Sequence, residues 1–243
     1  MILLVDVGNT RTKWRLLDNE ECLSESGFLN NDSITSAELD RRFKSFVAIR
    51  IVISCVASDA IFQVFREFAA LRAFEVHHIR PKQKMNAITF GYEEINSLGV
   101  DRCLAMIGAF ENEGLLVIDA GSAITADYIA SDGRHLGGYI LPGYNMSRKA
   151  LLGNTANIRL TTQVGVFELG RSTGECVNNG FAVMFRSLLS ALIQEAKERD
   201  IKRYVLTGGD AQVLKGFCID EVEVVENLVL DGMLKYFAEG VVR

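Results

Sequence analysis

The stretch Ile2-Leu3-Leu4-Val5-Asp6-Val7-Gly8-Asn9-Thr10 is an apolar run followed by an acid, a small apolar residue, a glycine and small polar residues. Leu115-Leu116-Val117-Ile118-Asp119-Ala120-Gly121-Ser122-Ala123 repeats this order 113 residues further along the chain. In both stretches the apolar run is typical of a buried strand, and the glycine allows a tight turn directly after it. A carboxylate at a strand end, beside backbone N–H groups, suits a hydrated metal ion and phosphate oxygens. Two such sites that face each other would form a nucleotide clamp.

The repeat extends past the turn. At the same offset Thr12 aligns with Thr125, and residues 14–17 align with residues 127–130. Each copy therefore predicts a hairpin, in which a buried strand, a polar turn and a second strand are followed by a loop of turn residues. Chance is the alternative, because two short Asp-x-Gly motifs are not rare in a chain with 21 glycines. The common offset across strand, turn, return strand and loop favours duplication.

The length and composition are those of a globular protein with a sizeable core. The chain has 243 residues, of which 49% are hydrophobic and 23% charged, and the repeat divides it into lobes of residues 1–112 and 113–243. We expect a helix over residues 102–112 to join the lobes. A formal charge of −5 and a pI near 5.4 disfavour a nucleic-acid-binding surface.

Cysteine usage and the apolar runs indicate a cytoplasmic protein. The five cysteines are odd in number and share no Cys-x-x-Cys spacing, so buried thiols in a reducing compartment are expected. No basic segment precedes the apolar N-terminal stretch, which disfavours a signal peptide. The apolar run 46–56 is too short for a membrane span and is interrupted by Arg50. The three histidines are expected to be structural or exposed rather than metal ligands.

Beyond the hairpins, strands alternate with helices. This alternation predicts an α/β protein with a mixed sheet covered by helices in each lobe. The expected helices cover residues 36–45, 60–72, 102–112, 173–199, 211–216 and 230–239, and the expected strands cover 47–56, 75–79, 203–206 and 222–225, with hairpin strands reaching about residue 140.

The phosphate-binding signatures of other folds are absent from the sequence. It has no Gly-x-x-x-x-Gly-Lys-Ser/Thr, no Gly-x-Gly-x-x-Gly and no Gly-x-Ser-x-Gly. The duplicated Asp-x-Gly hairpin and the turn Thr207-Gly208-Gly209 instead resemble the actin, hexokinase and Hsp70 superfamily. The resemblance implies duplicated actin-like, ribonuclease H-like lobes, with ATP between them and the glycine turn under its adenosine. Taken alone, Gly208-Gly209 is an ordinary strand-to-helix turn.

Four motifs narrow the resemblance. The segments 6–10, 99–102 (Gly-Val-Asp-Arg), 119–125 and 137–143 (Gly-Gly-Tyr-Ile-Leu-Pro-Gly) together look like the type III pantothenate kinase family, in that family's order and over essentially the whole chain. The resemblance implies phosphorylation of pantothenate to 4′-phosphopantothenate, the first step of coenzyme A biosynthesis. It further implies ATP as phosphoryl donor, Mg²⁺, a monovalent cation (K⁺ or NH₄⁺), and a homodimer that completes its active site across the interface.

The same resemblance implies roles for individual residues. Asp101 would be the catalytic base, Asp6 would hold Mg²⁺ through water, and Asp119 would bind K⁺. ATP would contact Asp6, Val7, Gly8, Asn9, Thr10, Arg11, Thr12, Lys13 and Ser122. Pantothenate would contact Tyr92, Gly99, Val100, Asp101, Arg102 and, from the partner subunit, Thr173.

Several of these positions also have a purely structural interpretation. Asp101 could be a helix N-cap, Arg102 a surface ion pair, Tyr92 a core side chain and Thr173 the N-cap of the long helix. The family has Thr most often where this chain has Ser122, which retains the hydroxyl. The apolar stripe of the long helix could pack inside one lobe or against a second chain; it comprises Phe181, Met184, Phe185, Leu188, Leu189 and Leu192.

Two other functions compete. A kinase with the same fold could act on another small acceptor, such as a sugar or an acetyl group's carboxylate, although the Gly-Val-Asp-Arg motif and the short chain disfavour this. A non-catalytic regulator is the second, because proteins named Bvg accessory transcription factors share the family. The set of Asp6, Asp101 and Asp119 favours a catalyst, and the acidic charge disfavours DNA binding.

Overall fold

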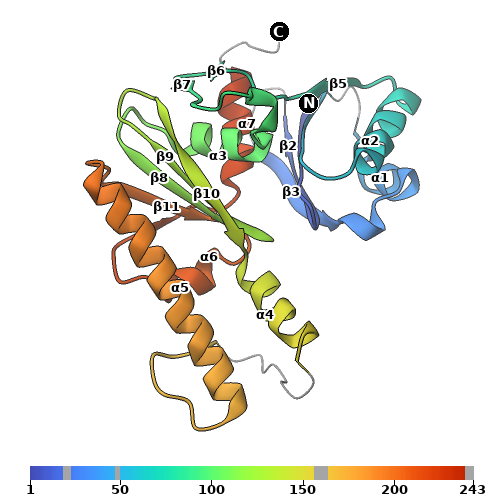
Figure 1. The fold of residues 1–243 in the computed structure, drawn as a ribbon. Coiled ribbons are helices and arrows are strands. Elements are labelled where there is room, and N and C mark those ends of the chain that lie inside the picture. Colours follow the sequence, from blue (N-terminus) through green and yellow to red (C-terminus); the bar gives the residue numbers. More distant parts are fainter. Residues whose placement is uncertain (19–22, 47–49, 156–163, 239–243) are drawn as a thin grey trace. The chain divides into compact units, whose positions relative to one another are not determined.

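The computed structural model describes residues 1–18, 23–46, 50–155 and 164–238 (Figure 1). Contacts divide the chain into two compact units. The first comprises Met1–Gly108 and the segment that begins at Leu228, and the second comprises Ala109–Asn227. The sequence predicts a boundary after residue 112 and assigns the last helix to the second lobe. In the structure, the contacts of that helix group it with the first unit.

The first unit is built on a five-stranded mixed sheet of order β3-β2-β1-β4-β5. β1 and β2 are antiparallel, as are β2 and β3, whereas β4 and β5 run parallel to β1. The strands are β1 (Ile2–Val7), β2 (Arg11–Leu17), β3 (Leu23–Asn30), β4 (Arg50–Cys55) and β5 (Glu75–His78).

The second unit repeats this sheet strand for strand. Its order is β10-β9-β8-β11-β12, with the same antiparallel and parallel pairs at the equivalent positions. The strands are β8 (Leu115–Ala120), β9 (Ala123–Ile129), β10 (His135–Pro142), β11 (Arg203–Thr207) and β12 (Glu223–Val224). The prediction of a duplicated α/β fold with a mixed sheet in each lobe is therefore confirmed.

The strand β3 was not expected. After the first hairpin the sequence had indicated only a loop, yet β3 forms there as the counterpart of β10. Its sequence is polar and glycine-containing, and most of its described side chains are exposed, because it lies at the edge of the sheet. An edge strand of this composition has no apolar alternation by which it could be recognised.

Helices lie on the sheets close to the predicted positions, and one of them, α4, was missed. They are α1 (Ser36–Phe43), α2 (Asp59–Leu71), α3 (Val100–Ala109), α4 (Tyr144–Gly153), α5 (Thr173–Glu198), α6 (Ala211–Lys215) and α7 (Leu228–Ala238), with the short turns η1 (Asn31–Ser33) and η2 (Ile95–Ser97) and the small hairpin β6 (Lys84–Met85) and β7 (Ile88–Thr89). The helix expected at 102–112 begins at Val100 and ends at Ala109. The first residues of the strand expected at 47–56 lie outside the described residues.

The core of the first unit lies between the sheet and helices α1 and α2, which are side by side in Figure 1. Trp14 of β2 meets Phe43 of α1 edge to face, with ring centroids 5.2 Å apart. Phe65 and Phe68 of α2 are fully buried in the same cluster.

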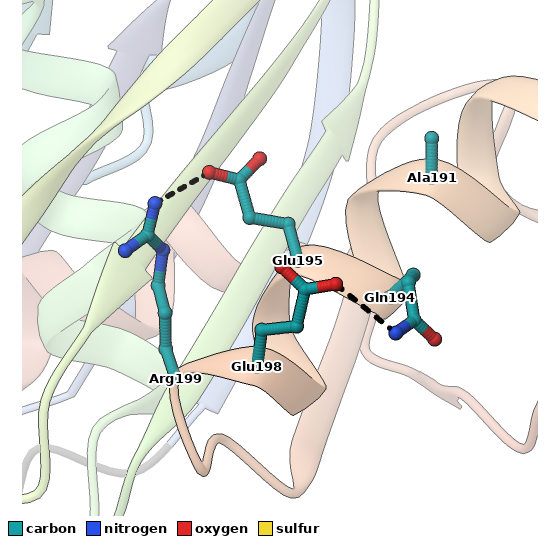
Figure 2. A pocket seen from close by; sticks show the side chains of 5 residues that line it. All are labelled: Ala191, Gln194, Glu195, Glu198 and Arg199. Carbon is teal, nitrogen blue, oxygen red and sulfur yellow. Dashed lines mark hydrogen bonds and ion pairs between the residues drawn. The ribbon is translucent and has the colours of Figure 1, made fainter.

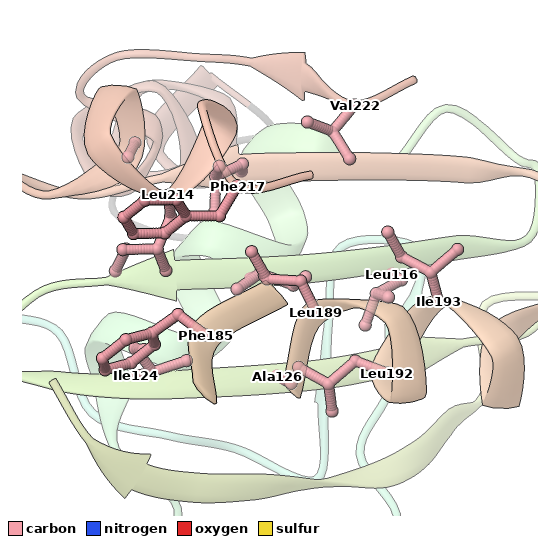
Figure 3. Close-up of a cluster of buried hydrophobic side chains, with 14 of the residues drawn as sticks. Leu116, Ile124, Ala126, Phe185, Leu189, Leu192, Ile193, Leu214, Phe217 and Val222 are labelled. Atoms are coloured by element: carbon pink, nitrogen blue, oxygen red, sulfur yellow. The ribbon is translucent and has the colours of Figure 1, made fainter. Parts of the chain in front are cut away.

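In the second unit, α5 covers one face of the sheet. Phe185, Leu189 and Leu192 pack on strand residues such as Ile124, as Figure 3 shows. Most of the predicted apolar stripe is therefore core, which explains why α5 alone among the described helices is apolar and long enough to cross a membrane. Met184, a member of the same stripe, is 45% exposed.

Glycines join α7 to α3 within the first unit. A Cβ on Gly232 would collide with the backbone carbonyl of Leu104, and one on Gly108 would lie 2.5 Å from the carbonyl oxygen of Leu228. Lys235 Nζ donates to the Gly108 carbonyl at 2.8 Å. The close approach of the α3 and α7 backbones at Gly108 and Gly232 explains why the last helix groups with the first unit.

The cysteines of the described segments are free thiols. Cys103 is buried, as expected, whereas Cys176 is exposed at the start of α5 and its thiol donates to the Gly170 carbonyl. Cys22 lies outside the described residues.

Candidate active site

The first hairpin places Asp6 at the end of β1. The register sets it opposite Lys13 on β2 and Ser54 on β4, and the Ser54 hydroxyl donates to Asp6 Oδ1 at 3.1 Å. The turn after Asp6 closes with a bond from Gly8 N–H to the Arg11 carbonyl, 3.1 Å long. Its residues Asn9, Thr10 and Arg11 are exposed, whereas Asp6 is half-buried. The turn can therefore present backbone groups to an anion beside a fixed carboxylate.

Asn31, which the sequence did not single out, fastens this turn. Its Nδ2 donates to the Gly8 carbonyl at 2.7 Å, and its Oδ1 accepts from the Thr12 hydroxyl at 2.9 Å. Thr12 is fully buried, so it supports the turn and has no exposed surface for a ligand. The sequence held no signal for Asn31, because it follows the edge strand that the pattern missed.

Gly99 directly precedes α3, and Val100, Asp101 and Arg102 lie in the first turn of that helix. Asp101 Oδ1 accepts from the Arg102 backbone N–H at 2.8 Å, and a Cβ on Gly99 would lie 2.5 Å from that same oxygen. Since α3 begins at Val100, Asp101 lies inside the helix and is not its N-cap. A glycine at position 99 thus leaves room for the carboxylate.

Arg102 and Tyr92 form a pair beside this turn. Arg102 Nη1 donates to the Tyr92 hydroxyl at 2.7 Å, and the guanidinium carbon lies 5.6 Å from the centre of the Tyr92 ring. Arg102 is only 5% exposed, so it is not a surface ion pair, and Tyr92 is half-buried rather than part of the core. The structure therefore brings Tyr92, Gly99, Val100, Asp101 and Arg102 together in one unit.

The second hairpin repeats the first around Asp119. Asp119 is half-buried and pairs with Thr125 on β9 and with the buried Thr207 on β11. Gly208 has a φ of +96°, and a Cβ there would collide with Asp119 Oδ1. The glycine turn after β11 is thus packed directly on this carboxylate, a contact that only glycine permits.

Two further turns meet the second hairpin. The Asp210 N–H donates to the Ala120 carbonyl at 2.9 Å, and the Gly143 N–H donates to the Ser122 carbonyl at 3.1 Å. Asn145 on α4 then donates to Asp210 Oδ1 at 2.7 Å. Ser122 itself is exposed. The strand-end carboxylate, the exposed hydroxyl and the Gly208-Gly209 turn therefore lie in one cluster of the second unit.

Thr173 is the first residue of α5, and the prediction that it caps the helix is wrong. The cap is Ser172, whose Oγ accepts from the Glu175 N–H at 3.3 Å, while Glu175 accepts from the Arg171 N–H at 2.7 Å. The two bonds resemble a capping box, except that the glutamate accepts from the residue before the cap and not from the cap itself. Thr173 is left exposed, with its side chain not needed for the cap.

The two strand-end carboxylates are compatible with cations that a bound ligand helps to hold. Within the described segments, no group of three or more His, Cys, Asp or Glu side chains is arranged to bind a metal ion. Mg²⁺ at kinase sites is commonly held by one or two carboxylates together with substrate phosphates and water. A single half-buried carboxylate such as Asp6, oriented by Ser54, fits that mode.

A shallow groove lies elsewhere, along the C-terminal end of α5 (Figure 2). Four of its lining residues, Ala191, Gln194, Glu195 and Glu198, belong to that helix, and the fifth, Arg199, directly follows it. Arg199 pairs with Glu195 at 2.6 Å, and Gln194 donates to Glu198 at 3.2 Å. The polar groups of the groove bond to one another, and none of the predicted site residues lines it.

The two similar sheets and their hairpins give the chain a duplicated actin-like fold. A proposed 2-dehydro-3-deoxygalactonokinase from Sinorhizobium meliloti superposes with a TM-score of 0.54 over all of both chains, at 12% identity. The sequence is more specific: residues 2–195 match the model of the type III pantothenate kinase family, and the chain belongs to that family.

Individual relatives agree with this assignment. A type III pantothenate kinase of Marinobacter nauticus is 36% identical over 99% of this chain and all of its own. One from Alcanivorax borkumensis is also 36% identical, over 96% and 97% of the two chains. A solved structure from Campylobacter jejuni, of a protein proposed as a Baf family transcriptional activator, has a TM-score of 0.66 at 26% identity and covers 98% of both chains.

Proposed function

We propose that this protein transfers the γ-phosphoryl group of ATP to the terminal hydroxyl of pantothenate, giving 4′-phosphopantothenate for coenzyme A biosynthesis. The observation that carries the proposal is the first turn of α3, where the Asp101 carboxylate accepts from the backbone N–H of the buried Arg102 and the guanidinium of Arg102 donates to Tyr92. Pantothenate has a hydroxyl to be phosphorylated and a carboxylate to be bound. A carboxylate base and a planar guanidinium match those two groups.

In this proposal, Asp101 orients the acceptor hydroxyl and takes its proton. Phosphoryl transfer passes through a loose transition state, so the enzyme mainly aligns the two oxygens and neutralises charge. An ordinary aspartate, with a pKa of about 3.9, is a weak base in the ground state. The proton therefore leaves late, as charge develops on the attacking oxygen. Arg102, oriented by Tyr92, binds the substrate carboxylate.

The two hairpins supply the groups for ATP. The backbone of the turn at residues 8–11 and the Lys13 ammonium would bind phosphate oxygens, and the Ser122 hydroxyl would add a further contact, whereas Val7 and Thr12 are fully buried. Asp6 would hold Mg²⁺ through water, and Asp119 would hold K⁺ or NH₄⁺. When bound, Mg²⁺ neutralises phosphate charge. The exposure of Asn9, Thr10, Arg11 and Ser122 supports these roles.

We further propose a cytoplasmic homodimer in which Thr173 reaches the pantothenate of the partner subunit. Residues 164–170 lie along the first half of α5, where Asn179 donates to the Glu168 carbonyl at 2.9 Å and accepts from the Val166 N–H at 3.0 Å. This region exposes large apolar side chains to solvent: Val164, Val166, Phe167, Leu169, Val183 and Met184. An apolar surface of this kind favours a protein interface beside Thr173.

A coupled assay of ADP release tests the proposed reaction. We expect release that requires Mg²⁺ and ATP and depends on pantothenate, with no comparable rate for glucose, N-acetylglucosamine or acetate. Turnover with one of those acceptors and none with pantothenate would show that pantothenate is not the substrate and that the other acceptor is. The Campylobacter jejuni relative's name suggests the alternative, a regulator. Nucleotide binding without turnover of any acceptor would favour that alternative.

A further inference from the structure

Three hydrogen bonds connect Asn31 to the turn of the first hairpin. The side-chain amide donates to the Gly8 carbonyl at 2.7 Å, and the side-chain oxygen accepts from the Thr12 hydroxyl at 2.9 Å. The Asn31 backbone N–H donates to the Thr10 carbonyl at 3.2 Å. A single residue after the edge strand β3 therefore contacts both sides of the turn that separates β1 from β2.

These bonds control which backbone groups the turn presents. Asn31 engages the carbonyl oxygens of Gly8 and Thr10, and the Gly8 N–H engages that of Arg11. Carbonyl oxygens repel phosphate, whereas N–H groups attract it. Holding these three acceptors inside the hairpin keeps them away from an anion that approaches the exposed turn.

We propose that Asn31 is a positioning residue that fixes the first hairpin in its phosphate-accepting form. The inference rests on the proposed function in one respect, namely that this hairpin holds the phosphates of ATP. A carboxamide is required because the position needs a donor for Gly8 and an acceptor for Thr12 at once. An aspartate of the same shape keeps the acceptor, loses the donor and faces the Gly8 carbonyl with a negative charge.

The decisive variant is Asn31→Asp, compared with Asn31→Ala and with Asn30→Ala as the matched control. Asn30 is the exposed neighbour, which uses its backbone carbonyl to accept from Ser33 Oγ at 2.7 Å. The Kd of the magnesium complex of the β,γ-imido analogue of ATP is measured by calorimetry. It is accompanied by kcat, by KM for ATP and for pantothenate, and by a thermal melt.

For Asn31→Asp we expect the Kd of the analogue and the KM for ATP to rise roughly tenfold. For Asn31→Ala we expect both to rise a few-fold. Changes of this size correspond to the loss of one or two hydrogen bonds. KM for pantothenate should stay within about twofold, whereas a merely structural role would lower Tm and the active fraction without separating the two KM values. Asn30→Ala should bind the analogue as the unchanged protein does. If Asn31→Asp does not fold, Thr12→Val, which removes one bond to Asn31, should still raise the Kd about threefold.

An unchanged Kd in folded Asn31→Asp, or an equal rise in Asn30→Ala, would overturn the inference, as would an unchanged protein that binds no analogue. Failure of the proposed function is distinguishable from these results. It would appear as normal binding of the analogue with no pantothenate-dependent ADP, and the effect of Asn31 on Kd could still be measured.

Discussion

Asp101 is the residue whose loss should separate catalysis from folding. Asp101→Asn keeps the shape of the side chain and an oxygen that can accept from Arg102, but it removes the base. We expect kcat to fall by about 10²-fold or more, with the melting temperature and ATP binding retained. Asp59→Asn is the control, because Asp59 is also an acid in the first turn of a helix and belongs to no candidate site. Near wild-type kcat in Asp101→Asn would end the assignment of the base.

Gly99 offers a test of the same carboxylate that leaves Asp101 in place. A methyl group at position 99 would lie 2.5 Å from Asp101 Oδ1, so the flexible carboxylate, rather than the backbone, must move. Gly99→Ala should therefore lower kcat by at least tenfold while changing Tm by little, because a displacement of about 1 Å already has large kinetic effects. The measurement is steady-state kinetics beside a thermal melt. A full kcat would show that the position of this carboxylate does not matter.

Asp119 is the residue at which a monovalent cation should act. We expect activity to rise when K⁺ replaces a bulky organic cation at constant Mg²⁺, and Asp119→Ala to reduce this response more than it reduces Tm. The reason is that a half-buried carboxylate packed against Gly208 offers oxygen ligands at a fixed place. Full activity in the organic cation alone would contradict the role of K⁺.

At the scale of elements, the contact between α3 and α7 depends on glycine. A methyl group on Gly232 would collide with the Leu104 backbone, so Gly232→Ala should force the two helices apart. We expect a loss of about 1–3 kcal/mol in the free energy of unfolding, which lowers Tm by roughly 3–10 °C in a chain of this length. Since α3 carries Asp101, kcat should fall as well.

The control for this prediction is Gly180→Ala in α5. A Cβ at Gly180 meets no atom within 4 Å in the described structure. Alanine is the better helix former by about 1 kcal/mol, so Tm should stay the same or rise slightly. Equal destabilisation by the two substitutions would mean that helix propensity, and not the close approach of α3 and α7, explains the effect.

At the scale of the whole molecule, the proposed dimer predicts complementation. Asp101→Asn and Thr173→Ala chains should each have low activity alone. Mixed and allowed to exchange subunits, they should recover part of the activity, because some sites then hold both intact residues. Sedimentation and a pull-down of one tagged chain measure the exchange. A fully active monomer, or no recovery despite proven exchange, would leave Thr173 as an exposed residue in the first turn of α5.

The sequence predicted some helices and strands and missed others. The apolar runs ending at Asp6 and Asp119 identified the duplicated hairpins, because a buried strand needs a continuous apolar stretch and its end needs a turn. The helical spacing of Phe185, Leu189 and Leu192 likewise located α5. By contrast, β3 and α4 left no comparable pattern, since much of their surface is exposed and their order depends on neighbours.

The sequence by itself determined the class of fold, the family and the residue types of the candidate site, because those depend on local patterns and motifs. Only the tertiary structure decided that α7 packs on α3 and that Thr12 is buried against Asn31. These features depend on contacts between segments far apart in the chain. A backbone contact at Gly232 or a hydrogen bond across 19 residues leaves no periodic trace in the sequence, so it becomes visible only when the chain is folded.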